Sequence, residues 1–142
     1  MKTNLAYFVS VLRKNFVNDC SRKLQQDHIT PGLLYPILYI GKHPNCSPKE
    51  VMQSLDMDWG FAQRTLDKLK ADNLISKEKN PEDRRCYHLN LTADGYRLFQ
   101  KSYELIDVWN EQKLAVLTPD EQLQLKNLLE KIVQVKGDKF YV

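Results

Sequence analysis

Residues 83–92 read Asp-Arg-Arg-Cys-Tyr-His-Leu-Asn-Leu-Thr, and Ala-Asp-Gly follows at 93–95. Within this stretch, 85–91 alternates between apolar and polar side chains, which is typical of a strand with one buried face. A partner strand is expected at 74–79, across a polar, charged tip. Thr92 is a good N-cap residue. The stretch therefore predicts a hairpin tip, a half-buried strand and the start of a helix.

The residues upstream of the hairpin predict two short helices that meet at a tight turn. Ser47-Pro48-Lys49-Glu50 is a capping box with proline at the first helical position. Asp58 can cap a second helix after a turn at 56–57. Asn73 tolerates the left-handed backbone conformation that ends a helix. Two helices and a hairpin in this order predict a winged helix-turn-helix.

Longer amphipathic helices flank this module. Thr92 can cap a helix that runs to about Lys113, and Thr118-Pro119-Asp120-Glu121 is a second capping box. Another helix is expected to begin at Thr30-Pro31, and Pro36 inside it predicts a late start or a kink. The first and last helices carry apolar stripes at helical spacing, at Leu5, Phe8, Val9, Leu12, Phe16, Cys20 and Leu24, and at Leu125, Leu128, Leu129, Ile132 and Val135.

The composition suits one globular domain with dimerisation arms, since 42% of the 142 residues are hydrophobic and 27% are charged. No apolar run approaches the ~20 residues of a membrane span, and no secretory signal precedes the first helix, so we expect a cytoplasmic location. The net charge is +3, but 58–88 holds seven Lys and Arg against six Asp and Glu. This balance argues mildly against non-specific nucleic-acid binding, because phosphate neutralisation supplies most of that affinity.

Three motifs follow one another along the hairpin and the later helices. They are Asp83-x-Arg85, Leu91-Thr92-x-x-Gly95 and Leu117-Thr118-Pro119-Asp120-Glu121. With these motifs in this order, the chain resembles the MarR (multiple-antibiotic-resistance regulator) family over nearly its whole length. The resemblance implies a mainly α fold: a winged helix-turn-helix with a small β-hairpin wing and N- and C-terminal dimerisation helices.

The resemblance also implies how the chain is organised and what it binds. Residues 1–142 would form a single MarR-like chain, with 30–92 as the winged-helix DNA-binding lobe. The helices of 1–29 and 93–142 would interleave in a homodimer. Family members mostly repress transcription, and small ligands loosen their hold on DNA. The expected partner is therefore double-stranded DNA with a pseudo-palindromic operator, read by two recognition helices about 34–36 Å apart.

The predicted DNA-binding residues lie on two elements. The segment 58–72 matches the family's recognition helix, where Gln63 suits adenine and Arg64 suits guanine. On the hairpin, Arg85 matches the arginine that enters the minor groove. The full set is Lys49, Trp59, Gly60, Gln63, Arg64, Lys68, Asp83, Arg84 and Arg85. The ordinary alternatives are a solvated helix face and a local ion pair at the hairpin tip.

The start of the expected recognition helix departs from the family pattern. Family members often place Ser or Thr there, where hydroxyls reach phosphates, whereas this chain has Asp58, Trp59, Gly60 and Phe61. Asp58 would face phosphate unless its carboxylate caps the helix. The exact contacts and the operator sequence are therefore not given by the resemblance.

The family's effectors bind between the dimerisation helices and the DNA-binding lobe. Aromatic and cationic side chains are expected to line such a pocket, with an arginine holding an aromatic acid. The residues we assign to it are Tyr7, Arg13, Tyr35, Tyr39, Tyr103 and Trp109. The alternative is that these aromatic residues are simply core.

Redox sensing is a weaker hypothesis, because it needs an exposed thiolate with a low pKa. Cys20 is expected to pack as a small hydrophobic residue, Cys46 to be exposed and Cys86 to lie beside the hairpin arginines. No metal site is predicted, because the spacing of the histidines matches no ligand pattern: His28, His43 and His88.

Two other functions are left open by the sequence. A winged-helix protein-interaction module without specific DNA binding is favoured by the near-neutral segment 58–88 and by Asp58. The other is a small enzyme. The chain has no glycine-rich phosphate loop, nucleophile elbow or suitably placed carboxylate pair, so neither enzymatic activity nor a cofactor is predicted.

Overall fold

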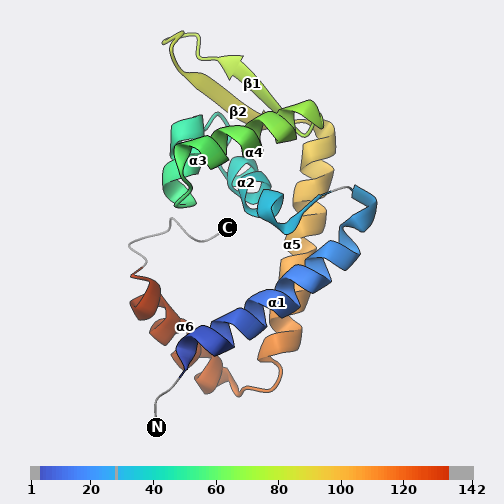
Figure 1. The fold of residues 1–142 in the computed structure, drawn as a ribbon, viewed down its shortest axis with the longest axis vertical. Helices are drawn as coiled ribbons and strands as arrows, with labels where there is room; N and C mark the ends of the chain where they lie inside the picture. The colour runs from blue at the N-terminus through green and yellow to red at the C-terminus, as the bar shows by residue number, and fades with distance from the viewer. Residues whose placement is uncertain (1–3, 28, 135–142) are drawn as a thin grey trace.

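The computed structural model describes residues 4–27 and 29–134, and it is mainly helical with a single hairpin (Figure 1). Val135 of the predicted last stripe and His28 lie outside the described residues. The elements in chain order are α1 (Leu5–Lys23), η1 (Gln25–Asp27), α2 (Pro31–Lys42), α3 (Pro48–Ser54), α4 (Trp59–Ala71), β1 (Ile75–Lys79), β2 (Tyr87–Leu91), α5 (Ala93–Leu114) and α6 (Pro119–Val133).

The elements form a lobe joined to a helical stem. Helices α2, α3 and α4 gather beneath the β1–β2 hairpin at one end of the molecule (Figure 1). Helix α5 runs from this lobe to the opposite end, and α1 packs across it. Helix α6 lies at that far end, where α1 begins. The arrangement is the predicted winged helix-turn-helix with helical arms.

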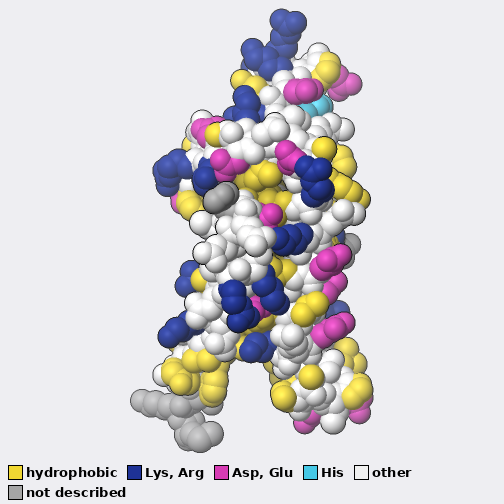
Figure 2. Space-filling view, turned by 90° about the vertical axis from the view of Figure 1, so that its right-hand side faces the viewer, with side chains coloured by type: hydrophobic (Ala, Val, Ile, Leu, Met, Phe, Trp, Pro, Cys, Tyr) yellow, Lys and Arg dark blue, Asp and Glu magenta, His cyan; other side chains and the backbone are white. Residues whose placement is uncertain are grey.

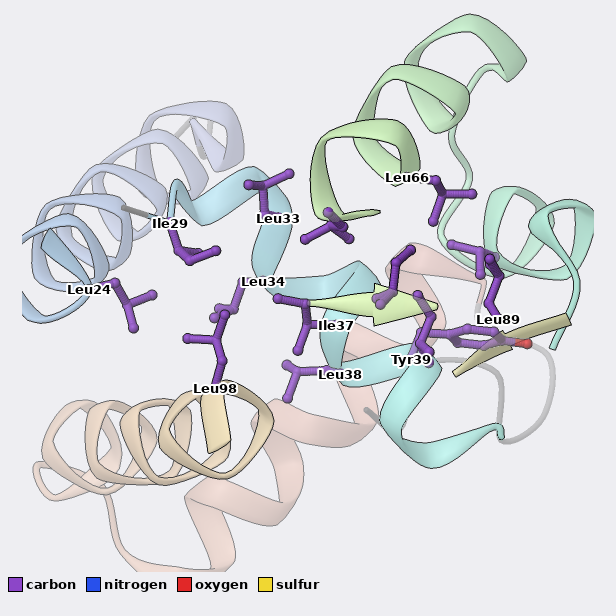
Figure 3. Close-up of a cluster of buried hydrophobic side chains, with 14 of the residues drawn as sticks. Leu24, Ile29, Leu33, Leu34, Ile37, Leu38, Tyr39, Leu66, Leu89 and Leu98 are labelled. Carbon is purple, nitrogen blue, oxygen red and sulfur yellow. The ribbon is translucent and has the colours of Figure 1, made fainter. Parts of the chain in front are cut away.

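The core of the lobe is built around α2. This helix is apolar on nearly all sides, so it can only be stable in the centre. Leu34, Ile37 and Leu38 are at most 1% exposed. Side chains from the residue that ends α1 and from α4, β2 and α5 surround them (Figure 3), namely Leu24, Leu66, Leu89 and Leu98. Burial of each such side chain contributes about 1.5–3 kcal/mol to folding.

Four of the predicted helix starts are confirmed by side-chain caps, whereas α2 begins at Pro31 as predicted but without a cap from the Thr30 side chain. Ser47 and Thr118 each form a complete capping box with the glutamate three residues later. Asp58 and Thr92 each accept a hydrogen bond from the backbone N–H three residues on. Asn73, predicted to stop α4, has φ of 57°. These local signals fix where the helices of the lobe begin and end.

Three sequence predictions were wrong in detail. The second strand begins at Tyr87 rather than at residue 85, because the Cys86 N–H donates to the Asp83 carbonyl at 2.9 Å and keeps the tip in a turn. Cys46 is only 5% exposed, because its backbone carbonyl accepts a 2.8 Å hydrogen bond from the Leu89 N–H and so extends the hairpin. Of the two effects predicted for Pro36, the late start is wrong, because α2 runs from Pro31 with the proline ring buried in the core.

The junction between the hairpin and α5 explains the Leu-Thr-x-x-Gly motif. The Thr92 hydroxyl donates to the Asn73 carbonyl at 2.7 Å and accepts from the Gly95 N–H at 3.0 Å. The Thr92 N–H donates to the Leu74 carbonyl at 3.0 Å. Gly95 is buried against that same carbonyl, and a Cβ there would overlap it. Only glycine therefore lets α5 start this close to the end of α4.

The stem leaves apolar surface uncovered. Helix α6 has no buried residue, and α1 buries only Cys20. Hydrophobic side chains gather on the two projections at the lower end of the molecule (Figure 2). The exposed members on these two helices are Leu5, Tyr7, Phe8, Val9, Val11, Leu12, Leu123, Leu125, Leu128, Leu129, Ile132 and Val133. None of the helices in the described part of the chain is both long and apolar enough to cross a membrane.

We predict that Gly95→Ala destabilises the protein by about 1–3 kcal/mol, because the added methyl group would have to displace the Leu74 backbone. The matched control is Gly32→Ala in α2, where the nearest atom to a new Cβ is 4.0 Å away. That change should leave stability unaltered or raise it by about 0.4–1 kcal/mol. Urea unfolding measures both, and equal effects at the two glycines would contradict this account of the junction.

Candidate nucleic-acid interface

Helix α4 buries one face and leaves the opposite face open to solvent. Its buried residues recur at helical spacing and are Ala62, Thr65, Leu66 and Leu69. Gly60, Arg64 and Asp67 are three or four positions apart and lie on the opposite side. The Asp58 carboxylate accepts the Phe61 N–H at 2.9 Å, so it is used as the helix cap. The acid that seemed unfavourable for phosphate binding is thus engaged with the helix backbone.

The outward face of the first turn of α4 is shallow. Gly60 has no side chain, and a Cβ placed there would lie 3.3 Å from Nη1 of Arg64. The arginine side chain therefore folds back along the helix over the glycine. Backbone and a guanidinium form this part of the surface, so a flat or concave partner can approach the helix closely.

A groove of about 320 Å³ lies between α3, α4 and the hairpin. It brings together four of the predicted DNA-binding residues: Lys49, Trp59, Gln63 and Arg85. Its walls are mainly apolar, and include Pro48, Leu66 and Tyr87, while cationic side chains frame it. The sequence could not show that the start of α3, the flank of α4 and the hairpin share one groove.

The hairpin tip is organised by Asp83. Its Oδ1 accepts from the Arg85 N–H at 3.1 Å and from Arg85 Nε at 3.2 Å, and its Oδ2 accepts from the Cys86 thiol at 3.6 Å. These hydrogen bonds, led by the one from the Arg85 backbone, lower the pKa of Asp83. The Arg85 side chain is still 91% exposed. Asp83 thus holds the base of the guanidinium and leaves its outer nitrogens directed to solvent.

Two asparagines fasten the hairpin to the loop before α3. Asn90 Oδ1 accepts the Asn45 N–H at 2.9 Å, and Asn90 Nδ2 donates to Asn45 Oδ1 at 2.9 Å. Asn45 has φ of 64°, a conformation that asparagine tolerates better than most residues. The pair joins positions 45 residues apart, and single-sequence reasoning had no signal for it.

Lys77 connects the hairpin to α4. Its ammonium group lies 4.9 Å from the centre of the Tyr87 ring and 3.9 Å from the Asp67 carboxylate. Its side chain is 19% exposed, so the alkyl stem is largely covered. Together with the asparagine pair, this lysine fixes the hairpin against the helix-turn-helix from both sides. It lines the groove and was missed because a strand lysine carries no distinctive sequence signal.

The remaining predicted DNA-binding residues lie at the edges of this surface. Arg84 is exposed at the hairpin tip. Lys68 forms a 3.0 Å ion pair with Asp72, the residue that follows the end of α4. Because both partners are exposed, this pair contributes at most about 0.5 kcal/mol and leaves the lysine free to exchange partners.

The six residues predicted to line an effector pocket have different neighbours in the structure. Tyr35 and Trp109 both contact Phe16, with ring centres 6.5 Å and 5.2 Å from it. Tyr39 stacks on His43 instead, and its hydroxyl accepts from Ser54 at 3.0 Å. Of the other three, Tyr7 contacts Phe8, Tyr103 packs on Phe99, and Arg13 is exposed on α1.

A second cavity, of about 440 Å³, lies between α1 and α5. Its lining is polar and cationic, and comprises Asn15, Asn18, Asp19, Arg22, Trp109, Gln112 and Lys113. Nε1 of Trp109 is buried without a hydrogen-bond partner. Arg22, rather than Arg13, is the arginine at this cavity, and it pairs with Asp19 at 2.5 Å.

The three cysteines lie apart in different environments and are free thiols. Burial is the main cause that raises the pKa of Cys20 to about 11 and the pKa of Cys46 to about 12. Both therefore stay protonated near neutral pH. Cys86 is exposed in the groove beside Asp83. Within the described residues, no group of three or more His, Cys, Asp and Glu side chains could hold a metal ion.

Comparison with known proteins identifies the family. Residues 37–85 match the model of the MarR family. Over 136 residues, 96% of the chain and 94% of the relative, the chain is 35% identical to the HTH-type transcriptional regulator BilQ of Clostridium symbiosum. It is 31% identical over 125 residues to the multiple antibiotic resistance protein MarR of Escherichia coli, covering 84% of this chain and 87% of that protein.

The chain belongs to the MarR family. Its relatives are transcription regulators and not enzymes, as the sequence indicated. The Staphylococcus aureus MepR–DNA complex matches with a TM-score of 0.86 at 18% identity, covering 94% of this chain and 98% of that one. Escherichia coli MarR complexed with operator DNA gives 0.80 at 23% identity, covering 90% and 92%. These two structures confirm the winged-helix fold of this MarR-family chain.

For this MarR-family protein we predict that Asn90→Ala lowers the free energy of unfolding by about 0.5–1.5 kcal/mol, because Asn45 loses its hydrogen-bond partners. The matched control is Ser76→Ala at the position paired with Asn90 in β1, which should change stability by less than about 0.5 kcal/mol. Urea unfolding decides the matter. No difference between the two variants would show that the asparagine pair does not fasten the wing.

We also predict that only Cys86 reacts with iodoacetamide in the native protein at pH 8, because Cys20 and Cys46 are buried and have raised pKa values. Their protection should persist until the pH approaches those values, of about 11 and 12, or until the protein unfolds. Mass spectrometry of peptides from the labelled protein measures the sites. Modification of Cys20 or Cys46 at the rate of Cys86 would contradict the burial described above.

Proposed function

We propose that this MarR-family transcription regulator is a sequence-specific DNA-binding repressor, that it acts as a homodimer, and that a small ligand releases it from DNA. The observation that carries the proposal is the shared groove. There the flank of α4, with Trp59 and Gln63, meets Arg85 of the wing. A helix and a wing held at a fixed distance can contact adjacent grooves of one duplex.

In this proposal α4 enters the major groove. Gln63 and Arg64 are exposed, and their side-chain groups are of the kinds that pair with adenine and guanine. Gly60 lets the helix backbone approach the base edges, and Lys49 and Lys68 reach phosphates on either side. The absence of a side chain at Gly60 and the use of the Asp58 carboxylate as a cap both support this docking.

The wing would follow the neighbouring minor groove. Arg84 and Arg85 stand at an exposed hairpin tip, and a narrow A-tract minor groove attracts such arginines. Asp83 orients Arg85 through its backbone and Nε, which leaves the outer guanidinium nitrogens for DNA. An exposed ion pair contributes little stability, so the tip is better explained by binding than by folding.

The uncovered apolar faces of α1 and α6 support a homodimer. A monomer that exposes this many large apolar side chains in two helices would be prone to associate. A second copy offers the same faces around a two-fold axis. Residues 4–27 and 93–134 supply these helices, and a dimer would place two copies of α4 about 34–36 Å apart, over a pseudo-palindrome.

The cavity between α1 and α5 is the proposed effector site. It lies in the stem, outside the proposed DNA surface, and a ligand there can change the angle between these helices. Its lining combines amide side chains, Lys113 and the Arg22–Asp19 ion pair, which suits a polar ligand, and Trp109 offers a buried N–H without a hydrogen-bond partner. Ligand binding would shift the population toward dimers whose α4 helices no longer match the operator.

We predict that Arg85→Ala weakens binding to the best site, found by selection from random duplexes, by about tenfold or more at fixed salt. The matched control is Arg97→Ala, an exposed arginine on α5 that pairs with Asp94 away from the groove. It should retain wild-type affinity. Fluorescence anisotropy measures both.

Two results of the Arg85→Ala experiment would contradict the proposal. Either the absence of any enriched site or equal affinities for wild type and Arg85→Ala would overturn the proposal. The near-neutral segment 58–88 would then favour the protein-interaction module, which predicts weak, non-selective DNA binding.

A further inference from the structure

Two aromatic side chains at the start of α4 are exposed. Trp59 is 56% exposed and Phe61 is 44% exposed, on a helix whose other exposed residues are mostly polar or charged. They flank Gly60, one on each side. The first turn of α4 thus presents a shallow glycine between two apolar rings.

Folding does not account for these two rings. The buried face of α4 begins at Ala62 and continues through Thr65, Leu66 and Leu69. The cap at Asp58 uses the Phe61 backbone N–H and not its ring. Both side chains therefore keep apolar surface in water in the free chain, and a ligand that covers them would remove that surface from water.

The surroundings of Trp59 indicate what covers it. Trp59 precedes Gln63 by one helical turn, and both line the groove with Lys49, Lys77 and Arg85. These cations would not favour an apolar protein surface as the partner of Trp59. They would favour a partner that carries phosphates. The floor of the DNA major groove carries one apolar group, the 5-methyl of thymine, and apolar side chains contact it.

We propose that Trp59 and Phe61 recognise thymine 5-methyl groups in the major groove, so that the bound half-site carries A·T pairs opposite the first turn of α4. The inference rests on the proposed DNA-binding function. Gln63, on the same flank as Trp59, then pairs with adenine at the same or the next base pair. The operator is identified by its methyl groups as well as by its hydrogen-bonding edges.

This mode of reading suits the charge of the chain. Segment 58–88 carries only one more cation than acid, so we expect counterion release to supply less affinity than in a strongly basic winged helix. The affinity gained from apolar contacts with methyl groups does not depend on counterion release, and so it does not fall with salt concentration as phosphate contacts do. The specific complex should therefore lose less affinity on raising salt than a strongly basic winged helix does.

Uracil scanning of the selected site tests the inference. Each thymine of one half-site is replaced singly by deoxyuridine, which removes only the 5-methyl group, and wild type, Trp59→Ala and Phe61→Ala are titrated by anisotropy. For wild type, at least one replacement opposite the start of α4 should weaken binding about three- to fivefold, the value of one buried methyl-sized group. The same replacement should have no effect on the variant whose ring contacts it.

Tyr96→Ala is the matched control, because Tyr96 is a 53% exposed aromatic residue on α5. It should show the full wild-type penalty for every uracil. Thermal unfolding shows whether the Trp59 and Phe61 variants remain folded. Because both rings are exposed, we expect their transitions within a few degrees of wild type, and the uracil scan of wild type alone already tests the contact.

The outcomes separate this inference from the proposed function. Specific binding by wild type with no uracil penalty, or a penalty that persists in both aromatic variants, overturns the inference and leaves the DNA-binding function standing. Absence of any selected site overturns both. A penalty lost only in Trp59→Ala or Phe61→Ala establishes the methyl contact.

Discussion

Apolar surface on α1 and α6 is the constraint on which the rest of the molecule depends. In the part of the chain that the structure describes, α6 buries none of its residues and α1 buries only Cys20. The lobe, by contrast, buries the apolar helix α2 at its centre. In the proposed homodimer, a second copy would cover the apolar faces of the two stem helices.

Helix α5 connects the lobe with the helical stem. Its first turns are fixed to the lobe by Thr92 and Gly95, and Leu98 and Leu105 lie in the core. Its last turns line the polar cavity with α1 through Trp109. A continuous helix thus connects the cavity with the lobe. In the proposed dimer, this helix would couple ligand binding to the separation of the two α4 helices.

Local chemistry made much of the fold predictable from sequence. The caps at Ser47, Asp58, Thr92 and Thr118 depend on residues three positions apart, so one sequence suffices to find them. Contacts between distant segments were not predictable. The Asn45–Asn90 pair, the bond that buries Cys46 and the approach of Lys77 to Tyr87 all arise from how the hairpin docks. The effector residues were assigned from their aromatic and cationic side chains and from the family resemblance, and of these six Trp109 lines the cavity between α1 and α5.

The most direct test of this account measures association of the full chain by sedimentation equilibrium together with thermal unfolding at several protein concentrations. If the stem helices are completed by a second copy, the chain sediments as a dimer, and its Tm rises with concentration because dissociation accompanies unfolding. A folded monomer at micromolar concentration, with a Tm that does not depend on concentration, would contradict the account.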